Sequence, residues 1–143
     1  MVNEIRHVGL VVRDVDRVLA FYRDSLGFVV QKDQLEKGPF VEKILGLPGL
    51  EVRTIKMKAL SGALLELLWF QAYASPGIER PIYGGGFSHM ALTVSDVDGL
   101  YRQLKARGIF FINDPEVSAD GKAKVAFCRD PEGNFLELVQ ELT

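Results

Sequence analysis

The sequence predicts an α+β fold built from two consecutive β-α-β-β-β modules, and two internal repeats are the reason. Residues 5–16 and 87–98 both place a His near the start of an apolar run, a small residue two positions later and Asp-Val-Asp at the end. Residues 62–67 and 133–138 both begin with a Gly, followed four residues later by a Glu among apolar residues. Because both repeats occur in the same order, we interpret the chain as an internal duplication.

The first module begins with a strand over residues 5–12, followed by a helix that Asp14 and Asp16 can cap and that runs to about residue 26. Gly27 ends this helix, and residues 28–32 form the next strand. Residues 36–50 are expected to form a loop with one helical turn. Strands over residues 51–57 and 62–70 complete the module.

The second module repeats this order. We expect a strand over residues 87–94, a helix over 96–107 closed by Gly108, and strands over 109–112, 122–128 and 134–142. We therefore predict a single domain over residues 1–143, with modules at about 4–72 and 84–143 and a linker at 73–83.

Composition limits the classes of function. The chain has 143 residues, of which 48% are hydrophobic and 25% charged, and its net charge of -2 gives no electrostatic reason to expect nucleic acid or a membrane surface. Cys128 is the single cysteine, so an internal disulfide and a cysteine-based zinc cluster are both excluded. We expect a cytoplasmic protein that acts on a small molecule.

Two glutamates are the most informative residues. Glu66 and Glu137 lie in segments that are apolar on both strand faces, which predicts that each carboxylate is buried. Buried carboxylates need a compensating cation. The two histidines of the chain, His7 and His89, also occupy matching positions, so these four residues can form a neutral site for a divalent metal. Ordinary salt bridges are the competing interpretation, with cations that also recur between the halves: Arg23 with Lys105, and Arg53 with Lys124.

Several motifs resemble the vicinal oxygen chelate superfamily, which contains glyoxalase I-like and methylmalonyl-CoA epimerase-like enzymes, bleomycin resistance proteins and extradiol dioxygenases. The motifs are the two His strands, Ala20-Phe21-Tyr22-Arg23-Asp24-Ser25-Leu26-Gly27-Phe28, and the segment from Phe127 to Leu138 with Asp130-Pro131-Glu132-Gly133 at its turn. The resemblance covers nearly the whole chain. It implies paired modules that form a cup-shaped mixed sheet around a metal site.

The resemblance further implies a glyoxalase I-like lyase or isomerase that uses Ni, Co, Zn, Mn or Fe. In such enzymes a substrate binds the metal through adjacent oxygens, and a ligating Glu moves a proton through an enolate. This makes Glu66 and Glu137 candidates for both ligation and catalysis. Members usually form homodimers. Alternatives are an epimerase-like isomerase, a ring-cleaving dioxygenase and a metal-free binding protein of the antibiotic-resistance kind.

Some positions depart from the family patterns. Glutathione-using members place Arg and Asn where this chain has Val11 and Phe70, which disfavours a glutathione adduct as substrate. Epimerase-like members have Gln in place of Glu66 and a separate Glu base on the preceding strand, where this chain has only Glu51. Residues 36–50 and 71–85 are expected to border the substrate cavity. Its candidate lining residues are Met57, Trp69, Phe70 and Phe127, and Cys128 is expected to be a buried small hydrophobe.

Overall fold

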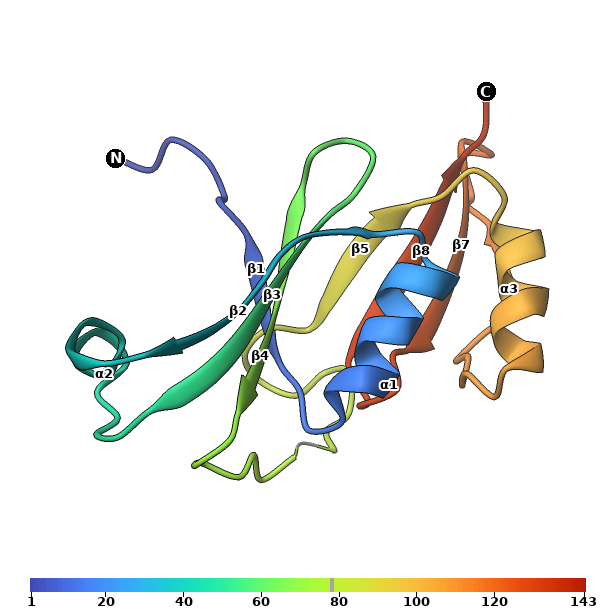
Figure 1. Cartoon of the computed structure of the whole chain (residues 1–143). Coiled ribbons are helices and arrows are strands. Elements are labelled where there is room, and N and C mark those ends of the chain that lie inside the picture. Colours follow the sequence, from blue (N-terminus) through green and yellow to red (C-terminus); the bar gives the residue numbers. More distant parts are fainter. Residues whose placement is uncertain (78) are drawn as a thin grey trace. The chain divides into compact units, whose positions relative to one another are not determined.

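The computed structural model describes residues 1–77 and 79–143 (Figure 1). Its contacts divide the chain into two compact units, Met1–Gly77 and Ile78–Thr143. Each unit contains one four-stranded mixed sheet with the predicted β-α-β-β-β order, which confirms the α+β fold class. The expected linker over 73–83 includes residue 78, which lies outside the described residues. None of the described helices is long and apolar enough to span a membrane.

The first unit contains four strands and three helical segments. They are β1 (Val8–Val11), α1 (Val15–Ala20), the π-helical turn η1 (Phe21–Ser25), β2 (Val29–Lys37), α2 (Pro39–Leu45), β3 (Glu51–Lys58) and β4 (Leu64–Phe70). The sheet order is β1-β4-β3-β2, with β1 parallel to β4 and the other neighbours antiparallel. Asp14 caps α1 by accepting a hydrogen bond from the Arg17 N–H at 3.1 Å, and the left-handed Gly27 (φ 80°) follows the helix, both as predicted.

The segment between β2 and β3 is more ordered than predicted. β2 extends to Lys37, and α2 is a seven-residue helix where we expected a loop with one turn. β2 is the edge strand of its sheet, so its polar residues lack the apolar alternation that identifies a strand. α2 buries Val41 in a small cluster with Leu50 and Val52.

The two faces of the first sheet carry different side chains. Ile55, Met57, Leu65 and Leu67 alternate onto one face and are fully buried. Val52, Leu68 and Phe70 lie on the other face, where the α2 cluster packs against them. Glu66 belongs to this second face, so the α2 cluster lies two to four residues along β4 from the candidate ligand.

The second unit contains β5 (His89–Thr93), α3 (Val97–Ala106), β6 (Glu116–Val117), β7 (Ala123–Arg129) and β8 (Phe135–Glu141). Its sheet order is β5-β8-β7-β6, with β5 parallel to β8. Asp96 caps α3 by accepting from the Gly99 N–H at 2.9 Å. Two residues of the sheet hold this helix: Lys124 donates to Asp98, and Gln140 accepts from the Val97 N–H. Lys124 and Gln140 lie opposite each other on the face that does not carry Glu137, so α3 packs on that face.

The predicted strand over residues 109–112 is wrong. This segment makes one isolated bridge, Phe111 to Cys128, and the short β6 forms later in the chain. Asn113 explains the interruption, because its side chain accepts from the Phe127 N–H at 2.9 Å and donates to the Val125 carbonyl at 3.2 Å. Backbone bonds from Ile112 N–H to the Phe127 carbonyl and from Arg129 N–H to the Phe110 carbonyl flank the bridge, and the amide side chain then takes the Phe127 N–H, so the ladder does not continue.

Candidate metal-binding site

The first His–Glu pair is a product of the parallel pairing of β1 with β4. The register aligns Gly9 with Glu66, and His7 precedes Gly9 by two residues and so lies on the same face. His7 Nε2 lies 3.9 Å from Glu66 Oε1. The Glu66 side chain is only 12% exposed, so its predicted burial is confirmed.

Lys56 is the residue at this pair that sequence reasoning missed. It lies directly opposite Glu66 on β3, and its Nζ is 3.8 Å from Glu66 Oε2. Each oxygen of Glu66 therefore has one basic side chain within 4 Å.

The cations proposed as competitors bind elsewhere. Arg53 pairs with Asp33, Lys124 with Asp98 and Arg23 with Asp24, while Lys105 donates to the Tyr101 hydroxyl. The salt-bridge alternative thus applies to Glu66 through a different lysine. That lysine could be found only from the register between β3 and β4.

The second His–Glu pair repeats the strand arrangement with different neighbours. β5 runs parallel to β8, Ala91 aligns with Glu137, and His89 Nε2 lies 3.1 Å from Glu137 Oε2. Phe127 occupies the place of Lys56 and meets the His89 ring edge-on, with centroids 5.0 Å apart. The Glu137 side chain is 26% exposed, so it is less buried than the sequence predicted.

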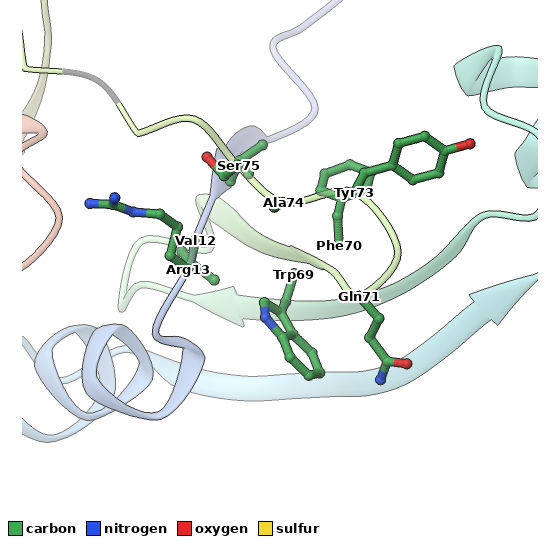
Figure 2. Close-up of a pocket in the computed structure, with 9 residues that line it drawn as sticks. Val12, Arg13, Trp69, Phe70, Gln71, Tyr73, Ala74 and Ser75 are labelled. Carbon is green, nitrogen blue, oxygen red and sulfur yellow. The ribbon is translucent and has the colours of Figure 1, made fainter.

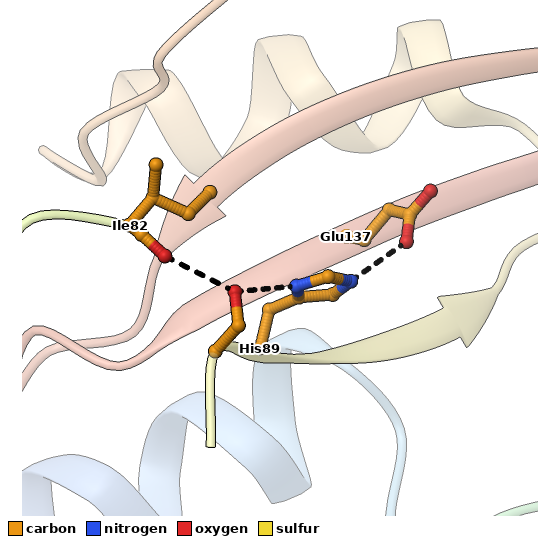
Figure 3. A network of polar contacts seen from close by, with 4 residues as sticks. Ile82, His89 and Glu137 are labelled. Carbon is orange, nitrogen blue, oxygen red and sulfur yellow. Dashed lines mark hydrogen bonds and ion pairs between the residues drawn. The ribbon is translucent and has the colours of Figure 1, made fainter. Parts of the chain in front are cut away.

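Ser88 fixes the orientation of the His89 ring (Figure 3). Its hydroxyl lies 3.3 Å from the Ile82 carbonyl oxygen and 2.9 Å from His89 Nδ1. A hydroxyl has one proton and a carbonyl can only accept, so two tautomers of His89 satisfy its contacts. Nδ1–H donates to Ser88 when Ser88 donates to Ile82, whereas Nε2–H donates to Glu137 when Ser88 donates to Nδ1. In the first of these tautomers the neutral ring has a lone pair on Nε2 that faces the Glu137 carboxylate. This contact is favourable only if a proton or another cation lies between the two atoms.

His7 has a different environment. Its Nδ1 is buried and has no hydrogen-bond partner among the described residues, and the residue before it is Arg6 rather than a serine. The two half-sites thus share their ligand types and strand positions. They differ in what holds the imidazole.

Each unit contributes one nitrogen and one carboxylate from these four residues. Among the described residues, no group of three or more His, Cys, Asp or Glu side chains is already assembled around one point. The joining of both pairs around one metal therefore stays a prediction.

A cavity of about 310 Å³ lies in the first unit, at the ends of β1 and β4 (Figure 2). Trp69 and Phe70 line it, together with Val11, Arg13 and residues 71 and 73–75. Val11 and Phe70 are the positions where the glutathione-using pattern has Arg and Asn. Met57 was expected to line a cavity, but it is fully buried on the opposite face of the sheet from Glu66.

The positions of Glu51 and Cys128 bear on the roles expected for them. Glu51 alternates onto the face opposite to Glu66, so it is not placed to act as the base on the preceding strand. Cys128 is fully buried, which confirms its expected role as a small hydrophobe, and burial raises the pKa of its thiol to about 12.

Comparison with known proteins connects this chain to a large superfamily. A sequence profile of the Glyoxalase/Bleomycin resistance protein/Dioxygenase superfamily matches residues 4–138. A probable lactoylglutathione lyase of Synechocystis sp. is 28% identical over 137 residues, which cover 94% of this chain and 92% of the relative. A lactoylglutathione lyase of Arabidopsis thaliana is 29% identical over 135 residues, but this chain spans only 43% of its length.

Solved structures show the same fold. The glyoxalase family protein from Bacillus cereus superposes with a TM-score of 0.91 at 21% identity, covering 100% of this chain and 97% of the other. The fosfomycin resistance protein FosX from Listeria monocytogenes, complexed with Mn(II) and sulfate, gives a TM-score of 0.69 at 14% identity, covering 99% and 95%.

Proposed function

Because the chain belongs to the Glyoxalase/Bleomycin resistance protein/Dioxygenase superfamily, we propose that it is a metal-dependent lyase or isomerase of the glyoxalase type. Its reaction is the transfer of a proton next to a carbonyl group of a small oxygenated substrate. The observation that carries the metal proposal is the His89–Glu137 contact at 3.1 Å, which brings an imidazole nitrogen and a carboxylate together in the second half, as His7 and Glu66 are brought together in the first.

The residues present fit a divalent metal. Two imidazoles and two carboxylates form a donor set that neutralises a 2+ charge and suits Zn, Ni, Co, Mn or Fe. In the first tautomer of His89, Ser88 accepts from Nδ1–H, which is the outer hydrogen bond that metal-bound histidines commonly make. His7, Glu66, His89 and Glu137 would hold the ion.

A divalent metal bound by these residues would polarise a substrate carbonyl and stabilise the negative charge that develops when the neighbouring proton leaves. We assign Glu137 as the base that takes this proton. Only Oε2 of Glu137 has a polar contact among the described residues, whereas both oxygens of Glu66 lie near basic side chains. Glu66 is thus assigned to ligation and Glu137 to ligation and proton transfer.

The cavity beside Val11 and Phe70 bears on the substrate. Its wall contains Trp69, Phe70 and Val11, which offer apolar contact where glutathione-using members offer charged and amide groups. Relatives that carry the name lactoylglutathione lyase are 26–29% identical to this chain. We propose that proton transfer is retained here while glutathione is not required.

Deuterium exchange tests this proposal without knowledge of the natural substrate. Metal-loaded protein in D2O is incubated with lactoylglutathione or with hydroxyacetone, and loss of the proton signal next to the carbonyl is followed by NMR. We expect exchange with hydroxyacetone that depends on added metal. The E137Q variant should keep its metal and lose roughly 10²–10⁴-fold in rate, the range for loss of a general base. Exchange at the parent rate in metal-loaded E137Q would overturn the assignment of the base.

A further inference from the structure

Two lysines and the ligand Glu66 form one row across the first sheet. Lys32 on β2 lies directly opposite Lys56 on β3, and Lys56 lies directly opposite Glu66 on β4. Side chains opposite one another in paired strands point to the same face, so the three form a continuous polar row. Like charges directly opposite each other destabilise a strand pair, so the placement of Lys32 opposite Lys56 does not serve the stability of the sheet.

The positive charge of this row exceeds the negative charge available to it. Lys56 lies 3.8 Å from Glu66, which is also 3.9 Å from His7, and among the described residues Lys32 has no ion-pair partner. If a metal bound Glu66, the charge of that carboxylate would be shared with the metal. Lys56 would then need a new anionic partner.

The second half shows that the fold does not require a lysine here. Phe127 takes the place of Lys56 opposite Glu137 and packs on His89. The same strand position thus accepts an aromatic ring where only support of the ligand is needed. A lysine at the first half therefore points to a role beyond the sheet itself.

We infer that Lys56, with Lys32 beside it, binds a carboxylate of the substrate next to Glu66. The inference rests on the proposed function and deepens it, because it assigns the substrate to the class of small carboxylate-bearing oxygenated acids. An ammonium at this place donates charge-assisted hydrogen bonds to a carboxylate. It also sets the charge preference, since a neutral substrate leaves Lys56 without a partner when Glu66 is bound to metal.

Two readouts with opposite signs test the role of Lys56. The probes are lactate and lactamide, which both offer adjacent oxygens to a metal but differ in charge. Calorimetry on metal-loaded protein should show that K56Q weakens lactate binding roughly 10- to 100-fold, as expected for loss of a charge-assisted hydrogen bond, and leaves lactamide binding unchanged. In the same variant, affinity for Zn²⁺ should rise by several fold, because a cation that competes for Glu66 is gone.

Matched variants separate a direct contact from a general effect of charge. K58Q removes the same charge from the same strand and face, two residues or roughly 7 Å further along, and should change lactate binding less than threefold. K56R keeps the charge and should keep the preference for lactate over lactamide. If K56Q and K58Q weaken lactate binding equally, or if K56Q leaves it unchanged, the inference is wrong while the metal site stands. If wild-type protein binds no Zn²⁺, the proposed function fails, and this inference fails with it.

Discussion

The two halves of the chain place the same candidate ligands by the same strand pairing, yet they surround them with different neighbours. In both halves a parallel pair of strands aligns a small residue, Gly9 or Ala91, with the glutamate. In the second half Ser88 and Phe127 hold the imidazole. In the first half Lys56 contacts the glutamate instead, and the imidazole Nδ1 has no partner among the described residues.

This difference separates what the topology determines from what individual residues determine. The strand order brings each His close to its Glu, because the parallel register aligns the glutamate with the residue two positions after the histidine. The neighbours then decide whether the pair is held in place or remains adjustable. Under the proposed function, the second half would supply rigid metal ligation and the first half ligation combined with recognition of the substrate.

Replacing each histidine in turn gives the largest expected effect. H89A should abolish stoichiometric binding of Zn²⁺, because it removes a nitrogen that Ser88 and Phe127 already orient. H7A should weaken binding as well, but less, since the His7 ring has no such support in the described residues. Calorimetric titration of the metal-free variants measures both affinities.

The asymmetry would be refuted if H7A cost as much affinity as H89A. Full metal occupancy in H89A would refute the whole ligand assignment. Circular dichroism of both variants serves as the folding control.

Removing the hydroxyl of Ser88 should have the next largest effect. S88A should lower Zn²⁺ affinity roughly 10- to 100-fold, which is the usual loss when a residue that hydrogen-bonds a metal-bound histidine is mutated. The nitrogen chemical shifts of His89 should also change, because Nδ1 loses its hydrogen-bond partner. S88T keeps the hydroxyl and should restore both the Zn²⁺ affinity and the nitrogen shifts.

S95A, at an exposed serine in the turn after β5, should change neither the affinity nor the shifts. An S88A protein with unchanged nitrogen shifts would show that Ser88 does not set the tautomer.

Sequence reasoning selected the four candidate ligands because repetition made them visible. Two histidines and two glutamates at matching positions of a duplication are a strong signal, and the burial of Glu66 follows from apolar neighbours on both strand faces. Lys56 gave no such signal, since a lone lysine in a strand is ordinary. Its contact with Glu66 depends on the register between β3 and β4, which the turn at residues 59–63 sets.

Two structural errors arose where the sequence pattern was an incomplete guide. Residues 109–112 have the composition of a strand, but Asn113 takes the backbone partners on β7. The length of β2 and the helix α2 were not predicted, because this edge strand is polar and a helix of seven residues shows little periodicity.

Alkaline pH should distinguish the cores of the two halves. Cys128 and Met57 hold equivalent buried positions, but only the cysteine can ionise. Its pKa rises from 9.0 to about 12 in the folded chain, so above pH 9 the unfolded state loses a proton that the folded state keeps. The contribution of Cys128 is therefore constant below pH 9 and lowers the stability as the pH rises from 9 towards 12, by about 2 kcal/mol at about pH 10.5.

Urea unfolding at several pH values measures this loss. C128A should have a lower stability at neutral pH because it leaves a small void, but its stability should fall less steeply above pH 9. Equal slopes for C128A and the parent chain would show that another group is responsible. M57L, a volume-conserving change at the equivalent position, should leave the slope unchanged.

The smallest expected difference concerns two equivalent cations with different partners. Arg53 makes two hydrogen bonds to Asp33 on the neighbouring strand, at 2.9 and 2.7 Å, whereas Lys124 makes one to Asp98 on α3 at 2.6 Å. The Arg53 guanidinium lowers the pKa of Asp33 below its ordinary value. The Arg53–Asp33 pair therefore stabilises the fold at neutral pH. This stabilisation is lost at acidic pH, as the pH falls through the lowered pKa of Asp33 and the carboxylate takes up a proton. Because both pairs are partly exposed to solvent, D33N and D98N should each cost less than about 1 kcal/mol at low salt and less at 1 M NaCl. D33N should cost more, since a two-bond arginine pair is geometrically better than a single lysine contact. Denaturant unfolding at both salt concentrations measures the difference, and a larger cost for D98N would show that anchoring α3 matters more than the cross-strand pair.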